Sequence, residues 1–524
     1  MKIAVLSLVT SAMLEKFSKD KIDTVIFCRL DKTVDYEAFS KQFKLINAFK
    51  DTTESNWHNF NLVTSQLRKL RSRLPGIFKY KSYDLEIALS KDMLWAFISR
   101  YALLFQAEKL KTSGKEFVFY DDRPLWEKKL ALLKKLFFYK HSAYVMQIPA
   151  DKQGSRDIAF RMNDLFMIDV YGDLFKKMKL QKVISFQTII AGNADAIDKQ
   201  MYEVFDVNFR IYPTNENRFR PGFFEKIKLV LMNGDPDFFN ALIYSLNCLY
   251  NHVDEYEKLF SAGIKKIVIN AGENEGEGSV LCDVAKKHDA LTFNYMNGAK
   301  EKSPQNIETH FDYWFMPDKK TQDLLLSYCN VEEKQLPVVG HLLQEKAEDH
   351  SYSGTLDMIM EKLKGKKVIG LFTSKIYVNE KIGVMSFLSD YLEKHPDIVV
   401  LVRKHPDELD SKDILNERII KLPEYPERLF QKSLFDLFLK SDVAISFSST
   451  VSYQASWFGI PSLNFEVAEV SRLSFVDNQK VFHVNSISIL QGYLDDFLYN
   501  GKELQGNVKG LKASDRIASI IQNS

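Results

Sequence analysis

Residues 442–465 have the sequence DVAISFSSTVSYQASWFGIPSLNF, and this stretch decides the predicted fold. Val443, Ala444 and Ile445 form a short apolar run, which is typical of a strand that is buried on both faces. A hydroxyl-rich turn, a short helix, a Gly-Ile-Pro turn and a second strand are predicted to follow. Because ligands bind at the carboxyl ends of the strands in an open parallel sheet, we expect a ligand site directly after this strand.

The turn that follows the strand is crowded with hydroxyl groups. They belong to Ser446, Ser448, Ser449, Thr450 and Ser452. A helix N-terminus offers free backbone N–H groups and a partial positive charge, and hydroxyl groups add further donors. This combination suits a phosphate group. The alternative interpretation is a helix cap and a polar turn, because capping favours the same residue types.

A second predicted strand, IVVLV at residues 398–402, carries basic side chains at its carboxyl end. The residues that follow it are Arg403, Lys404, His405 and Pro406. The same KHP triplet also occurs at residues 394–396, but there it ends a predicted helix, where Lys and His favour the C-terminus and Pro stops the helix. Position therefore predicts a functional role for His405 and a structural role for His395. The alternative for His405 is an ordinary histidine in a surface turn.

These two motifs resemble the C-terminal half of GT-B glycosyltransferases that build bacterial surface polysaccharides. The resemblance is to the group with an HP motif followed by an S-S/T motif, which includes sialyl-, polysialyl- and Kdo transferases. Teichoic-acid glycerophosphotransferases are similar at the same two places. The HP motif corresponds to His405-Pro406, and the S-S/T motif to Ser449-Thr450 or Ser448-Ser449. The resemblance covers residues 366–470 and implies that these groups hold the phosphate and cytidine of a CMP- or CDP-linked donor.

One position departs from a common GT-B pattern. Many enzymes of this fold that use UDP- or GDP-sugars place a Glu-Ala pair on the donor ribose, whereas this chain has Gln454-Ala455. A glutamine can hydrogen-bond a hydroxyl group, but without the charge of a carboxylate. The departure therefore favours a cytidine donor. Ser374 and Lys375, which follow a predicted strand at residues 368–372, are further candidates for donor binding.

Composition limits the possible classes of protein. The chain has 524 residues, of which 45% are hydrophobic and 27% are charged, and this predicts a soluble globular protein of two or three domains. Its 71 basic and 69 acidic residues give a net charge of +2, which argues against a protein that coats nucleic acid. The four cysteines are widely spaced and form no CxxC pair, so we predict a reducing compartment, no disulfide framework and no zinc site. No metal motif, P-loop or GxGxxG pattern occurs, and we predict no metal and no cofactor.

Alternating strands and helices predict an α/β fold with two Rossmann-like domains facing a cleft, GT-B-like, and with an enlarged N-terminal domain. The predicted parts are an acceptor-side domain at residues 1–348, in which residues 1–150 could form a sub-region, a linker at 349–361, a donor-binding domain at 362–505, and a helix at 506–524 that packs back on the first domain. The N-terminus does not match a signal peptide, and no apolar run of about 18 residues occurs. The sequence therefore predicts a cytoplasmic protein.

The acceptor hydroxyl group needs a general base, for which a glycine-rich stretch, AGENEGEGSV at residues 271–280, offers carboxylates. The candidates are Glu273, Glu275 and Glu277. Acidic side chains also simply favour helix starts, which is the alternative interpretation. Asp121, at the end of a predicted strand, is a further candidate, although the adjacent Asp122 is equally suited to cap the next helix.

That next helix, PLWEKKLALLKKLFF at residues 124–138, is amphipathic and has Lys128, Lys134 and Lys135 on one face. A basic amphipathic helix can rest on an anionic leaflet, so the sequence suggests peripheral contact with the inner membrane. The alternative is a core helix with a solvated lysine face.

Together these features predict metal-independent transfer of a sugar from a nucleotide-activated donor, CMP-linked by resemblance, to a glycan or glycolipid acceptor of a capsule, lipopolysaccharide or related surface glycan. Lys404, His405 and the hydroxyl groups would stabilise the departing phosphate. One alternative is transfer of glycerol- or ribitol-phosphate from a CDP-alditol, which needs the same phosphate site. Another is a non-catalytic subunit that binds sugar nucleotides or glycans; the turn MNGA at residues 296–299 lacks a histidine that related enzymes often have.

Overall fold

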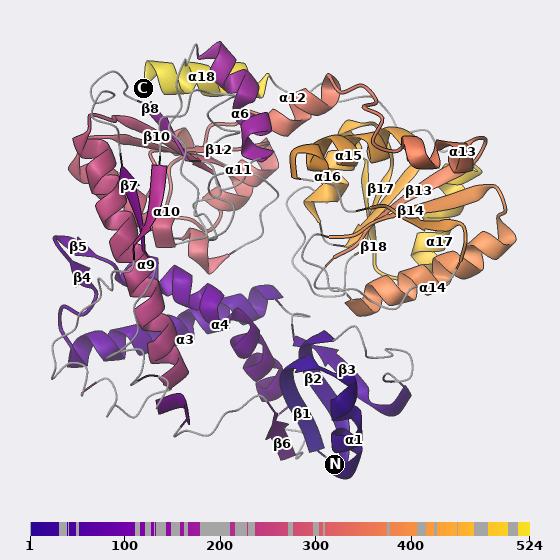
Figure 1. Ribbon diagram of the computed structural model, residues 1–524, viewed down its shortest axis with the longest axis horizontal. Coiled ribbons are helices and arrows are strands. Elements are labelled where there is room, and N and C mark those ends of the chain that lie inside the picture. Colours follow the sequence, from indigo (N-terminus) through magenta and orange to yellow (C-terminus); the bar gives the residue numbers. More distant parts are fainter. Residues whose placement is uncertain are drawn as a thin grey trace.

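The computed structural model of the protein describes residues 2–30, 39, 41–48, 52–110, 116–120, 127–129, 132, 143–147, 158–161, 166–178, 210–214, 228, 236–270, 276–296, 303–307, 310–374, 378–405, 416–423, 427–447, 449–465, 480–500 and 512–524. In this part of the chain, three larger β-sheets follow one another, and each is entirely parallel and flanked by helices. Figure 1 shows them as a lower unit in indigo, an upper-left unit in magenta and a right-hand unit in orange and yellow. The predicted α/β fold with Rossmann-like units is confirmed.

The enlargement of the N-terminal region takes the form of a separate parallel sheet. Its strands, in the spatial order β3-β2-β1-β6, are β1 (Lys2–Val9), β2 (Ile22–Leu30), β3 (Lys44–Asn47) and β6 (Glu116–Phe119). Helix α1 (Ser11–Lys19) covers the sheet through Phe17, which is buried and stacks on Phe39. This N-terminal unit therefore has a hydrophobic core of its own.

Two long helices, α3 (Thr52–Arg73) and α4 (Glu86–Lys109), join the N-terminal unit to the middle one. The first half of α4 places Leu89 and Met93 in the core of the middle unit, and its second half places Leu103 and Ala107 against the N-terminal sheet. One continuous helix therefore packs against two sheets, and Figure 1 shows α3 and α4 between the lower and upper units.

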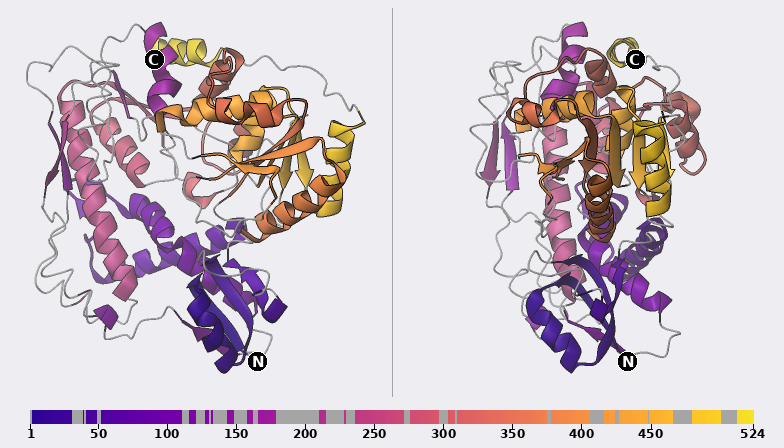
Figure 2. Two further views of the ribbon diagram at one scale, coloured as in Figure 1. Left: turned by 45° about the vertical axis from the view of Figure 1, so that its right-hand side comes forward. Right: turned by 90° about the vertical axis from the view of Figure 1, so that its right-hand side faces the viewer.

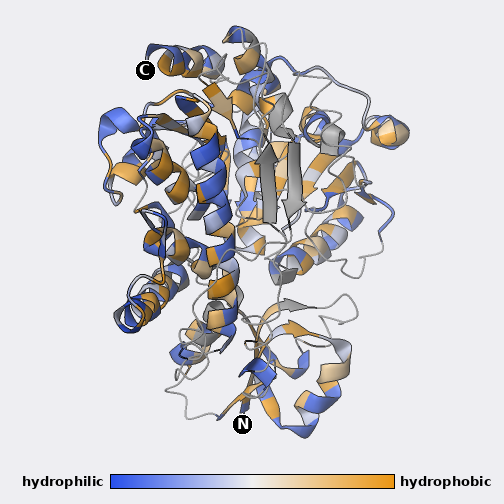
Figure 3. Ribbon diagram, turned by 60° about the vertical axis from the view of Figure 1, so that its left-hand side comes forward, coloured by the Kyte–Doolittle hydropathy of each residue, from blue (hydrophilic) through white to orange (hydrophobic). Residues whose placement is uncertain are grey.

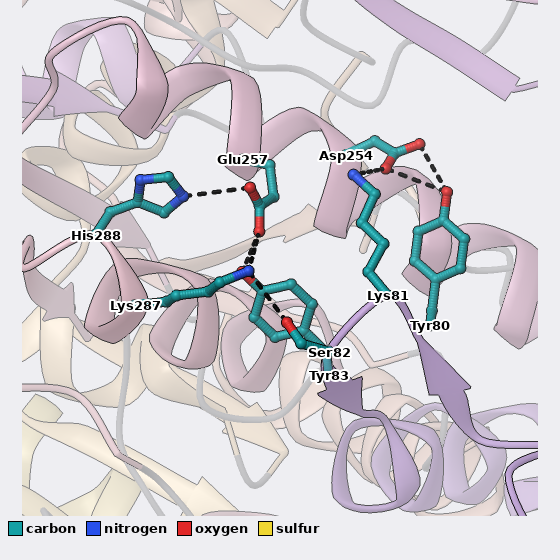
Figure 4. A network of polar contacts seen from close by, with 8 residues as sticks. All are labelled: Tyr80, Lys81, Ser82, Tyr83, Asp254, Glu257, Lys287 and His288. Atoms are coloured by element: carbon teal, nitrogen blue, oxygen red, sulfur yellow. Dashed lines mark hydrogen bonds and ion pairs between the residues drawn. The ribbon is translucent and has the colours of Figure 1, made fainter.

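A short hairpin between these helices, β4 (Lys79–Tyr80) and β5 (Tyr83–Asp84), docks on the middle unit through the polar network of Figure 4. The Tyr80 ring stacks on Tyr250 at 4.0 Å, and its hydroxyl group donates to Asp254 at 3.0 Å. Glu257 accepts hydrogen bonds from the Tyr83 hydroxyl group and from Lys287 Nζ at 3.1 Å.

The middle unit contains a parallel sheet in the order β12-β11-β10-β8. Its strands are β8 (Ile158–Phe160), β10 (Lys266–Asn270), β11 (Leu291–Tyr295) and β12 (Tyr313–Phe315), and its helices include α6 (Phe166–Lys177), α9 (Pro236–Ser261), α10 (Gly276–Lys287), α11 (Lys319–Leu326) and α12 (Leu342–Glu348). An antiparallel pair, β7 (Ala143–Gln147) and β9 (Arg210–Thr214), lies beside α9. Leu242, Leu246, Leu249 and Val253 recur at helical spacing along α9 and are all buried, which explains why this long helix forms the centre of the core.

The C-terminal unit has a six-stranded parallel sheet in the order β15-β14-β13-β16-β17-β18. Its elements are β13 (Lys367–Phe372), α14 (Val378–Lys394), β14 (Ile398–Arg403), β15 (Ile419–Lys421), α15 (Glu427–Lys440), β16 (Val443–Phe447), α16 (Thr450–Trp457), β17 (Ser462–Phe465), β18 (Val481–Val484) and α17 (Ile487–Leu498).

Every residue of β14 and β16 is buried, as the apolar runs predicted. Helices α14 and α17 cover one face of the sheet and α15 the other, and Figure 2 shows the strands between them. Many helices in Figure 3 carry blue and orange on different sides, as helices that bury one face do.

A buried carboxylate anchors the segment that joins the middle unit to the C-terminal unit. Asp436 of α15 is fully buried and accepts hydrogen bonds from His350 Nε2 at 2.9 Å and from the backbone N–H groups of Ser353 at 2.8 Å and Thr355 at 2.9 Å. Burial opposes ionisation of Asp436, but these donors outweigh it, and its pKa lies below the ordinary value. The segment around residues 350–355 is thus fastened to the C-terminal unit.

The C-terminal helix α18 (Ala513–Asn523) leaves the C-terminal unit and packs on the middle one, as Figure 1 shows in yellow at the top. Ile517 and Ile521 are buried in the core of the middle unit. Lys266 Nζ donates to the Ile521 carbonyl oxygen at 2.7 Å, and Lys177 pairs with Asp515 at 2.6 Å. The chain therefore crosses between these two units twice.

Candidate functional site

The strand order of the C-terminal sheet places a topological switch point between β13 and β16. From β13 the chain moves outward to β14 and β15, and it then returns to β16 on the other side of β13. The loops after β13 and β16 therefore leave the sheet in opposite directions and separate at the carboxyl edge, which is where doubly wound sheets bind ligands. Both predicted motifs, after β14 and after β16, lie at this edge.

Thr373, which directly follows β13, forms hydrogen bonds with the end of β14. The Thr373 N–H group donates to the Arg403 carbonyl oxygen at 3.1 Å, and the His405 N–H group donates to Thr373 Oγ1 at 3.2 Å. Ser374, Lys404 and His405 are half-buried. The carboxyl edge thus presents a hydroxyl group, an ammonium group and an imidazole group from two adjacent strand ends.

The turn between β16 and α16 is a capped helix start. Ser449 is the N-cap residue of α16, and its Oγ accepts a hydrogen bond from the Val451 N–H group at 3.3 Å. The cap that the sequence offered as an alternative is therefore present. It does not exclude ligand binding, because a serine hydroxyl group that accepts a hydrogen bond can still donate its own proton. Thr450, the first residue of α16, is half-buried beside it.

Gln454, one turn into α16, is 9% exposed. Its Oε1 atom has no hydrogen-bond partner within the described ranges of the chain. Buried polar atoms without a partner are uncommon in folded proteins, so such an atom marks a place where a ligand could complete the hydrogen bonding.

Arg403 was predicted to bind the donor, but its side chain does not lie at the surface of this edge. Its side chain is buried, and its NH1 atom donates to Ser433 Oγ of α15 at 2.8 Å. Ser433 is itself fully buried. Arg403 therefore points into the packing of α15 against the sheet, and Lys404 and His405 are the predicted basic residues that the described part of this edge presents at its surface.

His395, the histidine of the other KHP triplet, lies at the opposite edge of the sheet. It follows the last residue of α14 and precedes β14. Its ring lies 4.2 Å from that of Tyr391 and 5.0 Å from that of Tyr499, and its carbonyl oxygen accepts a hydrogen bond from Arg418 NH1 at 2.8 Å. The two KHP triplets therefore occupy opposite ends of β14.

In the middle unit, Glu277 is buried in the first turn of α10 and forms an ion pair with Arg161, which directly follows β8. It also accepts a hydrogen bond from the Tyr256 hydroxyl group at 2.7 Å. Burial opposes ionisation of Glu277, but the charges of Arg161 and His252 outweigh it, and its pKa lies below the ordinary value. Glu277 is therefore a buried, paired carboxylate with a structural role, whereas the sequence predicted it as a candidate general base.

The residues around Glu277 were not predicted. His252 of α9 places Nδ1 at 3.4 Å from Glu277 Oε1 and 3.6 Å from Glu255 Oε2. Burial lowers the pKa of His252, but the two carboxylates outweigh it and raise the pKa to about 9, so the imidazole is cationic at neutral pH. Arg161, His252 and Glu277 come from three distant segments, and nothing in their local sequence signals the cluster.

Close packing against α4 explains the glycine at position 276, the first residue of α10. The Gly276 N–H group donates to Asp92 Oδ1 of α4 at 2.8 Å, so α4 supplies the cap of α10. A Cβ atom at position 276 would overlap the carbonyl oxygen of Ala88. Only glycine permits this approach of the two helices.

Several predicted residues lie outside the described residues. They are Asp121, Asp122, Lys134, Lys135, Glu273, Glu275, Lys375, Pro406 and Ser448. Lys128 is described, and it is buried and forms an ion pair with Asp237 at 3.5 Å. The expectation that Lys128 belongs to a solvated or membrane-facing lysine face is therefore wrong.

Helix α16 also contacts the middle unit. The Tyr453 hydroxyl group donates to Asp318 Oδ2 at 3.3 Å, and the Trp457 ring lies 4.9 Å from that of His341. His341 Nδ1 in turn lies 3.2 Å from the Tyr295 hydroxyl group at the end of β11. The helix whose first turn borders the predicted phosphate site is thus in direct contact with the neighbouring unit.

Among the residues that the structure describes, no group of three or more His, Cys, Asp or Glu side chains could hold a metal ion. None of the described helices combines the length and the apolar character needed to cross a bilayer.

Comparison with known proteins gives structural similarity alone. No protein-family model matches the sequence, and no curated protein matches it significantly. Among solved structures, UDP-GlcNAc 2-epimerase from Methanocaldococcus jannaschii is 14% identical, with a TM-score of 0.47 over 70% of this chain and 99% of that one. The S. aureus MnaA–UDP co-structure is 15% identical, with a TM-score of 0.46 over 70% and 96%. The wall teichoic acid polymerase TagF, as its H548A variant, is 13% identical, with a TM-score of 0.39 over 76% and 97%.

Proposed function

We propose that the protein is a glycosyltransferase that moves a sugar from a nucleotide-activated donor, CMP-linked, to an acceptor glycan of a bacterial capsule, lipopolysaccharide or related surface polymer. The observation that supports this most is the convergence of Thr373, Ser374, Lys404, His405 and the Ser449-Thr450 turn at one switch-point edge. Cationic and hydroxyl donors at such an edge suit a ligand that carries phosphate.

In this proposal the donor phosphate lies between the end of β14 and the first turn of α16. Lys404 supplies positive charge, the His405 imidazole supplies an N–H donor, and the hydroxyl groups of Ser449 and Thr450 supply further hydrogen-bond donors. Transfer requires negative charge to accumulate on the departing phosphate, and fixed donors in a site that excludes water stabilise that charge, by roughly 3 kcal/mol each. The buried Oε1 of Gln454 would accept a hydrogen bond from a ribose hydroxyl group.

The acceptor hydroxyl group must lose a proton to a base from the acceptor-side part of the chain, residues 1–348. Glu277 is a poor candidate, because it is buried and paired with Arg161. The candidates are then Glu273 and Glu275, which precede α10 in the sequence, with Asp121 behind them. Peripheral contact with the inner membrane stays a prediction, but Lys128 is no longer among the residues that would make this contact.

Donor profiling with purified protein tests the proposal. CMP-sialic acid, CMP-Kdo, CDP-glycerol, CDP-ribitol, UDP-GlcNAc and GDP-mannose are each incubated with the protein, with and without a capsule or lipopolysaccharide extract, and release of free nucleotide is measured. We expect release from a CMP-sugar that increases with acceptor. Turnover of a CDP-alditol alone would identify an alditol phosphotransferase, and binding without turnover of any donor would identify a non-catalytic subunit.

A further inference from the structure

Asn464 of β17 lies beneath the turn that joins β16 to α16. Its side chain is fully buried, and it is the register partner of Ser446 at the carboxyl end of β16. Its Oδ1 atom accepts a hydrogen bond from the Ser449 N–H group at 3.4 Å. It also lies 3.4 Å from Ser446 Oγ and 3.3 Å from Ser452 Oγ, and one of these two hydroxyl groups donates to it. One amide oxygen thus contacts the end of the strand, the cap residue and the first turn of the helix.

The hydroxyl groups around this oxygen also bond to each other. Ser446 Oγ and Ser452 Oγ form a hydrogen bond, and both are fully buried. Two of the five hydroxyl groups that the sequence offered as phosphate donors therefore belong to the interior. Ser449 differs, because its backbone N–H group points to Asn464 while its Oγ caps α16. The bond to Asn464 thus holds the cap residue from below.

We propose that Asn464 is a positioning residue of the donor-phosphate site: its side-chain oxygen holds the Ser449-Thr450 turn in the conformation that binds phosphate. This inference rests on the function proposed above. Asn464 does not touch the donor. It acts by fixing the backbone of Ser449, so that the first turn of α16 is oriented before the ligand arrives and less conformational freedom is lost on binding.

The test compares four proteins by calorimetry: the wild type, Asn464→Ala, Asn464→Leu and the control Asn294→Ala. Asn294 is equally buried, but in β11 of the middle sheet. Each protein is titrated with CMP, CDP and UDP and with the nucleosides cytidine and uridine, after its melting temperature has been measured. Asn464→Leu keeps the approximate size of the side chain but lacks the acceptor oxygen, so it serves if the alanine variant does not fold.

We expect Asn464→Ala to bind the preferred nucleotide about tenfold more weakly while its affinity for the matching nucleoside changes less than twofold. Asn464→Leu should weaken nucleotide binding by a similar factor, because it also lacks the acceptor oxygen. Asn294→Ala should leave the ratio of the two affinities unchanged. A purely structural role would reduce stability without changing that ratio.

Two results would overturn the inference, and they are distinguishable. If the wild type binds a nucleotide and both Asn464 variants keep its ratio of nucleotide to nucleoside affinity, Asn464 does not position the phosphate site, while the proposed function stands. If the wild type binds none of CMP, CDP and UDP, the proposed function is wrong and this inference is wrong with it.

Discussion

The His405 N–H group donates to Thr373 Oγ1 at 3.2 Å, so the basic loop after β14 is fastened to the end of the central strand β13. The N–H group of Thr373 also donates to the Arg403 carbonyl oxygen at 3.1 Å. This attachment holds the residues on both sides of Lys404. It gives Lys404 and His405 a fixed place beside the switch point.

This relationship predicts the effect of Thr373→Val, which keeps the shape of the side chain but removes the acceptor. The His405 N–H group would then lack its partner, which costs roughly 1–3 kcal/mol where such a group is buried. We expect weaker nucleotide binding by calorimetry and a lower melting temperature. Thr373→Ser, which retains an Oγ acceptor, is the matched control and should bind nucleotide nearly as the wild type does; equal weakening in both variants would contradict the role of this hydroxyl group.

The two KHP triplets provide a paired test. His405→Ala should abolish transfer and leave the melting temperature nearly unchanged, because His405 is half-buried at the edge. His395→Ala should show the reverse pattern. It loses ring contacts with Tyr391 and Tyr499, each worth about 0.5–1.5 kcal/mol, and transfer should persist. Loss of transfer in both variants, or in His395→Ala alone, would refute the functional distinction between the two edges of the sheet.

Glu277→Gln should destabilise the fold rather than act on chemistry. The substitution leaves Arg161 as a buried charge without its partner, and breaking such a pair costs about 3–5 kcal/mol. Urea unfolding measures this loss. Glu273→Gln and Glu275→Gln are the comparison, since the proposed base is the one whose removal abolishes transfer at unchanged stability. If Glu277→Gln is fully stable but inactive, Glu277 is the base after all.

The network of Figure 4 predicts a dependence of stability on pH. Burial raises the pKa of Glu257, but hydrogen bonds from Tyr83, Lys287 and His288 outweigh it and lower the pKa to about 2. Because the folded-state pKa is below the unfolded value, Glu257 contributes stability at pH values above the unfolded pKa. This contribution is lost as the pH falls toward 2.

The free energy of unfolding should therefore differ between the wild type and Glu257→Gln by a constant amount above about pH 5, and the difference should shrink below about pH 4.5. Urea unfolding at pH 7, 5, 4 and 3 measures it. Glu333→Gln, which removes a carboxylate from an exposed ion pair with Lys319, is the control and should have little effect at any pH. A difference that grows with acid would show that Glu257 is not held as an anion.

The sequence predicted the C-terminal unit better than the rest for a physical reason. A parallel strand that is buried on both faces must be apolar throughout, so β13, β14 and β16 are visible as continuous runs, and the residues at their carboxyl ends follow directly. The edge strand β18 (VFHV) was not predicted, because its histidine interrupts the apolar run. The direction of the Arg403 side chain also could not be predicted, because both faces of β14 are buried.

The cluster around Glu277 shows what sequence patterns cannot supply. Arg161 and Glu277 are 116 positions apart, and Asn464 reaches Ser446 across 18 positions and a strand boundary. Such pairs depend on which strands become neighbours, and no local pattern encodes that. Local patterns did offer a helix cap in this turn as an alternative, because capping depends only on adjacent residues, and the structure places the cap at Ser449.

The most direct test of the central claim, a phosphate site at the edge formed by β13, β14 and β16, is a melting panel. Wild type and His405→Ala are heated with CMP, CDP, UDP and GDP at matched concentrations. At a hundred times its dissociation constant, a ligand adds about 2.7 kcal/mol to stability, which corresponds to a shift of several degrees. We predict that CMP or CDP gives the largest shift in the wild type and little or none in His405→Ala. Equal shifts in the two proteins, or no shift with any nucleotide, would contradict the claim.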